Sequence, residues 1–90
     1  MTCRVEFVKS SRREFDDLPR KTQDKVLEAL QLLATNPFSE LLRIKKLKGA
    51  ESLYRFRVGD YRVVYEVRRE VLLILVIKIG HRRDVYRQLA

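Results

Sequence analysis

The sequence has few of the residues on which metal centres, disulfide frameworks and phosphate-binding loops depend. Its 90 residues include one cysteine, one histidine and three glycines. Because a single cysteine cannot form an internal disulfide, the sequence favours a reducing cytoplasm over secretion. One cysteine with one histidine is too few for the usual zinc site, and no glycine-rich phosphate loop is present. We therefore expect neither a metal nor a cofactor.

Long apolar segments are also absent. The longest apolar run is Val71–Ile77, which is bounded by Glu70 and Lys78, whereas a membrane-spanning helix needs about 20 such residues. The first residues are charged from Arg4 onward and lack the apolar core of an export signal. The sequence therefore predicts a cytoplasmic protein with no membrane partner.

Positive charge, by contrast, is abundant and unevenly distributed. The chain has 20 Lys and Arg against 12 Asp and Glu, which gives a formal net charge of +8. Residues 1–42 carry equal numbers of both signs, so the whole excess lies in residues 43–90. Clustered Lys and Arg attract phosphates and release counterions, which favours a polyanion-binding surface over an ordinary solvated one.

Hydrophobic periodicity predicts one α+β domain over residues 1–90. Residues 4–8 alternate as a short strand, a helix capped by Ser10 or Ser11 ends near Leu18, and the three- and four-residue spacing of apolar positions predicts a helix over 20–34. Strands are expected over 53–58, 61–67 and 71–79, the last being central because it is nearly all apolar, and Gly80 closes it. The expected architecture is an N-terminal strand and helical hairpin packed on a mainly antiparallel four-stranded sheet, followed by a short C-terminal tail with some helical character.

A two-residue turn at Gly59–Asp60 fixes the pairing of two of these strands. In that register Arg57 lies opposite Arg62, and Arg55 lies two residues away on the same face. Like charges directly opposite each other destabilise a sheet. Either the three side chains extend into water without a ligand, or they converge on an anion such as a phosphate, which the planar fork of arginine suits.

Three segments carry a family resemblance. They are residues 44–49 (IKKLKG), 53–65 (LYRFRVGDYRVVY) and 79–86 (IGHRRDVY). With the preceding strand and helical hairpin, they resemble the RelE branch of the RelE/ParE toxin superfamily over almost the whole chain. The resemblance implies the RelE-like fold and the role of toxin in a type II toxin–antitoxin system. The implied activity is that of a ribosome-dependent mRNA endoribonuclease that uses no metal. In the implied reaction, the ribose 2′-hydroxyl of the message attacks the adjacent phosphate. The implied partners are a cognate antitoxin, the ribosome, mRNA, and operator DNA reached only through the antitoxin.

The resemblance also implies roles for single residues. Arg62 matches the arginine that holds the scissile phosphate, and Tyr86 matches the tyrosine that stacks on a base. Arg82 matches the arginine that stabilises the leaving oxygen or serves as the acid. Arg55 and Arg57 stand where the best-known member has lysines. Because arginine stays protonated, it is a poor general base.

Proton transfer therefore needs another candidate, and histidine is the residue type suited to it near neutral pH, which favours His81. Lys46 and Lys48 are further candidates for the base or for a phosphate contact. The predicted catalytic residues are Arg57, Arg62, Arg82, Tyr86 and His81. The predicted RNA- or phosphate-binding residues are Lys46, Lys48, Arg55 and Arg83. Two alternatives keep the same fold: a ParE-like inhibitor of DNA gyrase, which would not need this set of residues, and a catalytically inactive partner of an antitoxin and operator DNA.

Overall fold

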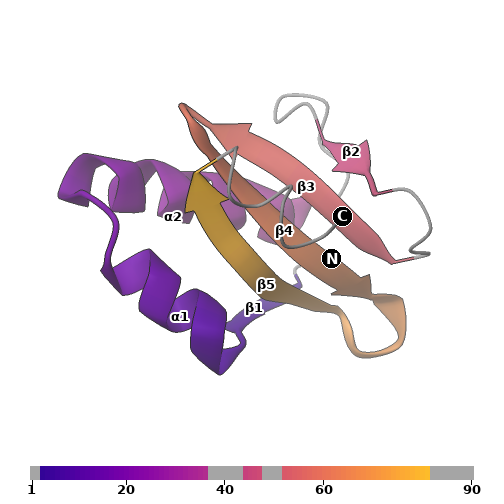
Figure 1. The fold of residues 1–90 in the computed structure, drawn as a ribbon. Coiled ribbons are helices and arrows are strands. Elements are labelled where there is room, and N and C mark those ends of the chain that lie inside the picture. Colours follow the sequence, from indigo (N-terminus) through magenta and orange to yellow (C-terminus); the bar gives the residue numbers. More distant parts are fainter. Residues whose placement is uncertain (1–2, 37–43, 48–51, 82–90) are drawn as a thin grey trace.

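The computed structural model describes residues 3–36, 44–47 and 52–81, and it confirms the α+β class (Figure 1). The elements follow the order β1 (Arg4–Phe7), α1 (Lys9–Asp16), α2 (Arg20–Thr35), β2 (Lys45–Lys46), β3 (Leu53–Val58), β4 (Tyr61–Arg68) and β5 (Leu73–His81). One turn of 3₁₀ helix, Arg69–Val71, joins β4 to β5. The helical hairpin is as expected, but the sheet has five strands, not four.

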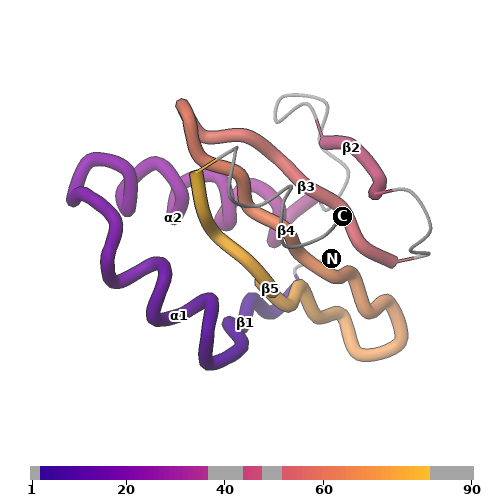
Figure 2. Tube along the Cα trace, in the orientation of Figure 1, coloured from indigo at the N-terminus to yellow at the C-terminus, as the bar shows by residue number. Residues whose placement is uncertain are grey.

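The order of the strands differs from their order in the chain. The sheet runs β1-β5-β4-β3-β2, and every neighbouring pair is antiparallel except the parallel pair β1–β5. Figure 2 traces this arrangement, in which the first and last described strands run side by side. The apolar strand β5 is therefore internal, as its composition predicts. It begins at Leu73 and continues through Gly80 to His81, so Gly80 does not close it.

The hydrophobic core lies between α2 and one face of the sheet, which we call the helix face. The predicted apolar stripe of α2 is buried at Val26, Ala29, Leu30 and Leu33. It packs in one cluster with strand residues that include Phe56, Val63, Tyr65, Ile74 and Ile79. In Figure 1 this helix passes behind the sheet. Burial of one large apolar side chain contributes about 1.5–3 kcal/mol, so this layer supplies much of the stability of the fold.

Ser11 anchors α1 to the sheet and does not cap the helix. The helix begins at Lys9, after Val8, and has no side-chain cap. Ser11 lies within the helix and is fully buried, with its Oγ 2.7 Å from the carbonyl oxygen of Val76. The expected cap at Ser10 or Ser11 was wrong because the hydroxyl serves a tertiary contact.

Glu14 makes a second link between α1 and β5. Its carboxylate accepts a hydrogen bond from the backbone N–H of Ile79 at 3.0 Å and pairs with Lys78. Since β1 ends at Phe7, no strand among the described residues pairs with β5 beyond Val76 on that side. The helix covers this stretch of edge and satisfies part of its backbone.

Candidate functional site

Residues on the β3–β4 hairpin alternate between the core and the opposite side of the sheet. Phe56 pairs with Val63 on the helix face, and both are almost completely buried, at 1% and 0% exposure. The next pair along the hairpin is Arg57 with Arg62. Because successive side chains of a strand point to opposite faces, these arginines lie on the other side of the sheet, which we call the arginine face. The predicted pairing is confirmed.

The tight turn of the hairpin explains why this register is fixed. Gly59 occupies the first of the two loop positions and has φ of 58°. This left-handed conformation costs glycine little and is the one that the first position of a II′ hairpin turn requires. With only Gly59 and Asp60 in the loop, Arg57 and Arg62 must pair one step from the turn.

Arg62 occupies an internal position of the sheet. It lies between Arg57 on β3 and Gly80 on β5, and glycine adds no side chain at this position. Arg62 is only 6% exposed, whereas Arg57 is exposed. A permanently charged guanidinium in a poorly solvated position acts on a nearby anion with little screening. The Arg57–Arg62 row therefore combines one buried cation with one exposed cation.

A second cationic row lies two residues farther from the turn than the Arg57–Arg62 pair. Arg55 is half-buried and pairs on one side with Val64 and on the other with Lys45 of β2. Lys45 therefore lies on the arginine face, although it is not among the site residues predicted from the sequence. Lys46 pairs with Tyr54, which belongs to the opposite set of positions, so it does not share that face. This position does not favour the predicted role of Lys46 in phosphate binding. Only the pairing of β2 with β3 distinguishes these two lysines, and no local pattern in the sequence reveals it.

His81 is separated from the arginines. It pairs with Tyr61, and their rings meet edge to face with centroids 6.0 Å apart. Tyr61 precedes Arg62 on the same strand, so the Tyr61–His81 pair lies on the helix face. This position does not favour the predicted role of His81 in proton transfer at a phosphate held by Arg62. The other predicted site residues, Lys48, Arg82, Arg83 and Tyr86, lie outside the described residues.

Tyr65 belongs to the core beneath the site. Its ring stacks on that of Tyr54 with centroids 5.9 Å apart. Burial raises the pKa of Tyr65 well above its usual range, and Tyr54 adds to the effect. The phenol therefore stays neutral at physiological pH and has a structural role.

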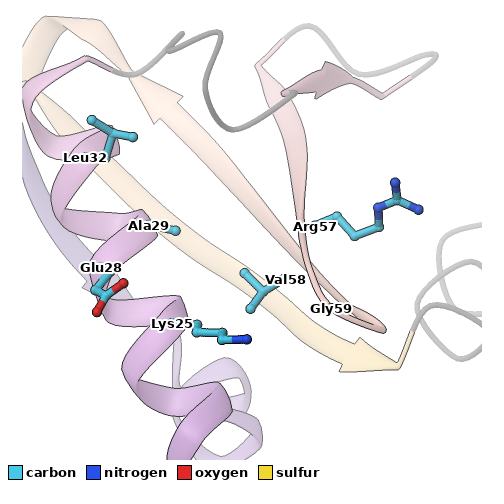
Figure 3. Close-up of a pocket in the computed structure, with 7 residues that line it drawn as sticks. All are labelled: Lys25, Glu28, Ala29, Leu32, Arg57, Val58 and Gly59. Carbon is cyan, nitrogen blue, oxygen red and sulfur yellow. The ribbon is translucent and has the colours of Figure 1, made fainter.

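A pocket of about 350 Å³ opens between α2 and the β3–β4 turn (Figure 3). Its lining residues are Lys25, Glu28, Ala29, Leu32, Arg57, Val58 and Gly59. Val58 points toward the helix, whereas the guanidinium of Arg57 extends away from it. The pocket is thus distinct from the arginine face, although the two adjoin at β3.

The described residues contain neither a metal-binding cluster nor a membrane-spanning helix. Within 3–36, 44–47 and 52–81, no group of three His, Cys, Asp or Glu side chains is placed to hold a metal ion. In the same part of the chain, no helix is long and apolar enough to cross a membrane.

Comparison with known proteins identifies the family. The model of the family described as the ParE toxin of the type II toxin–antitoxin system parDE matches residues 5–86. A candidate toxin RelE1 of Methanocaldococcus jannaschii is 36% identical over 88 residues, which cover 97% of this chain and 98% of that protein.

Solved structures agree with this match. A chain of the archaeal RelE–RelB complex from Pyrococcus horikoshii is 34% identical, with a TM-score of 0.80 and coverage of 91% of this chain and 97% of that one. A chain of the RelBE2 toxin–antitoxin complex from Mycobacterium tuberculosis is 25% identical, with a TM-score of 0.77 and coverage of 91% and 100%. The chain belongs to the RelE/ParE superfamily and is a RelE-like toxin of a type II toxin–antitoxin system, as its sequence motifs predict.

Proposed function

We propose that the protein is a ribosome-dependent endoribonuclease that cuts mRNA and so inhibits translation. The observation that carries the proposal is the Arg57–Arg62 row, in which a buried guanidinium lies opposite an exposed one on the sheet face away from α2. A cognate antitoxin is the proposed protein partner, since RelE relatives have been crystallised with RelB. Operator DNA would be reached through that antitoxin.

In the proposed reaction, the 2′-hydroxyl of the message attacks the adjacent phosphate. A bond forms between the 2′-oxygen and phosphorus, the bond to the 5′-oxygen of the next nucleotide breaks, and a cyclic phosphate remains. Negative charge builds up on the phosphoryl oxygens in the transition state. Arg62 and Arg57 stabilise this charge because guanidiniums donate several hydrogen bonds and stay protonated. By family resemblance, Arg82 stabilises the leaving 5′-oxygen or donates a proton to it, and Tyr86 stacks on a base.

The position of His81 limits what this chain does for the proton of the 2′-hydroxyl. His81 contacts Tyr61 on the helix face, and Lys46 is also absent from the arginine face. We therefore assign to the described residues the tasks of orienting the 2′-hydroxyl and phosphate and of stabilising charge. Acceptance of the proton is assigned to Lys48 or to a group of the ribosome.

Expression of the chain in a translating cell extract, followed by primer extension on the message, tests the proposal. Cuts that keep a fixed phase with the codons, and that disappear with Arg62→Ala, are the expected result. Intact mRNA together with relaxed plasmid DNA would instead indicate gyrase inhibition, the alternative favoured by the ParE name of the matching family model. Intact mRNA with unchanged plasmid supercoiling would indicate an inactive binding partner.

A further inference from the structure

The edge strand β2 places two neighbouring lysines on opposite faces of the sheet. Both Lys45 and Lys46 are exposed. Lys45 pairs with Arg55, and Lys46 pairs with Tyr54. Because side chains alternate along a strand, only Lys45 extends the arginine face. Two residues of the same type, adjacent in the chain, thus differ in the surface to which they add charge.

The cations of the arginine face form a diagonal track. It starts at Arg62 on the internal strand β4, continues to Arg57 and Arg55 on β3, and ends at Lys45 on β2. Arg55 and Arg57 are two residues apart, which corresponds to about 6.7 Å along a strand. This separation is comparable to that between successive phosphates of an extended single-stranded nucleic acid.

The remaining residues beside the second row confine its positive charge to the β2–β3 side. Val64, the β4 member of the row, is apolar and fully buried. Lys78, which pairs with Val64 from β5, forms an ion pair with Glu14 of α1. Farther along β4 on this face, Glu66 contributes a carboxylate that is paired with Arg68. An anion on this row is therefore attracted toward Lys45 and Arg55.

We propose that Lys45, together with Arg55, binds the phosphate next to the scissile one. The site then holds two successive phosphates of an extended single strand, with Arg57 and Arg62 at the cleaved linkage. This inference rests on the proposed ribonuclease function and adds a substrate-binding residue to it. Lys45 is a positioning residue, because it fixes the path of the strand and does not touch the reacting atoms.

Lys45→Ala and its matched control Lys46→Ala test the inference in single-turnover cleavage on programmed ribosomes. We expect Lys45→Ala to lower kcat/KM about tenfold, mainly through KM, as loss of one charged contact does. Lys46→Ala should stay within about twofold, since it removes the same charge from the other face. Because both lysines are exposed, both variants should melt like the wild type.

A message with a neutral methylphosphonate at one linkage beside the cleaved one identifies the contacted phosphate. The neutral linkage is placed first on one side of the cleavage point and then on the other. At the position that Lys45 contacts, the phosphate no longer carries a charge, so we expect wild type and Lys45→Ala to cleave equally there. The inference would be overturned if Lys45→Ala and Lys46→Ala had equal effects on cleavage. It would also be overturned if the defect of Lys45→Ala stayed the same wherever the neutral linkage was placed. The proposed function is judged separately, because it fails only if the wild-type chain leaves the message intact.

Discussion

The two faces of the β3–β4 hairpin have opposite properties although they are built from alternate residues of the same strands. On the helix face, Phe56 and Val63 pack against α2 with almost no exposure. One residue closer to the turn on each strand, Arg57 and Arg62 place two positive charges side by side. The core pair stabilises the sheet, whereas the arginine pair opposes it through like-charge repulsion. Stability and the proposed activity should therefore be separable by substitutions one residue apart.

Phe56→Ala should have the largest effect, and the effect should fall on stability. Removal of a buried phenylalanine costs about 3–5 kcal/mol, a large part of the 5–15 kcal/mol typical of a small domain. Urea unfolding should show a lower midpoint for Phe56→Ala, while Arg57→Ala should remain within about 0.5 kcal/mol of the wild type. Equal losses in the two variants would remove the distinction between the faces.

Arg62→Ala should abolish most of the cleavage activity. Loss of one positioned donor to a developing oxyanion costs about 10²–10³ in rate. Because Arg62 is buried, its truncation also removes packing along the side chain, so Arg62→Lys serves as the second variant. Arg62→Lys keeps the charge but loses the bidentate fork, so its cleavage rate should lie between those of the wild type and Arg62→Ala. Full activity of a folded Arg62→Ala protein would contradict the site assignment.

Tyr65 allows the helix face to be tested by pH. Because the pKa of Tyr65 is raised in the folded protein, the unfolded chain loses this proton first as the pH increases. The stabilisation is complete below the ordinary tyrosine pKa of about 10 and declines above it, by up to about 1.4 kcal/mol per pH unit. Thermal melts between pH 8 and 11 should show a smaller alkaline loss for Tyr65→Phe than for the wild type. Identical slopes would indicate that the phenol is not protected in the core.

Arg57 allows the arginine face to be tested by salt. Binding of a single-stranded RNA oligomer should weaken as salt rises, with about 0.7 added to the slope of log affinity against log salt for each phosphate contact. Fluorescence anisotropy should give a slope lower by about that amount for Arg57→Ala than for the wild type. An affinity independent of salt would indicate an apolar protein surface as the main target.

His81→Gln should have the smallest effect. His81 lies on the helix face beside Tyr61, away from the arginine pair. Single-turnover cleavage and its pH profile should therefore match those of the wild type. A lower rate or an altered pH profile in His81→Gln would instead place His81 at the reacting atoms and would show that the two faces cooperate in the chemistry.

Several features of the protein follow from its sequence alone because they depend on short-range chemistry. The amphipathic spacing of α2 and the alternation of β3 are periodic patterns within one element. The register that brings Arg57 opposite Arg62 follows from a two-residue turn beginning with glycine. The excess positive charge of residues 43–90 and the motifs of the family can be read directly. These observations were enough to predict the α+β class and the central arginines of the candidate site.

Other features were decided only by tertiary structure because they depend on contacts between distant segments. The parallel pairing of β1 with β5 joins residues more than 60 positions apart. The contact of Ser11 with β5 spans a similar separation. The pairing of β2 with β3 places Lys45, and not Lys46, on the arginine face.

The side on which His81 lies has a specific cause. Tyr65 pairs with Val76 but Val64 pairs with Lys78, so β5 contains one extra residue between these positions. Because the side-chain period of a strand is two, one inserted residue moves every later side chain to the other face. Strict alternation from the buried Val76 would bring His81 to the arginine face. The bulge, which forms where β5 meets β4, turns it to the helix face and separates it from Arg62.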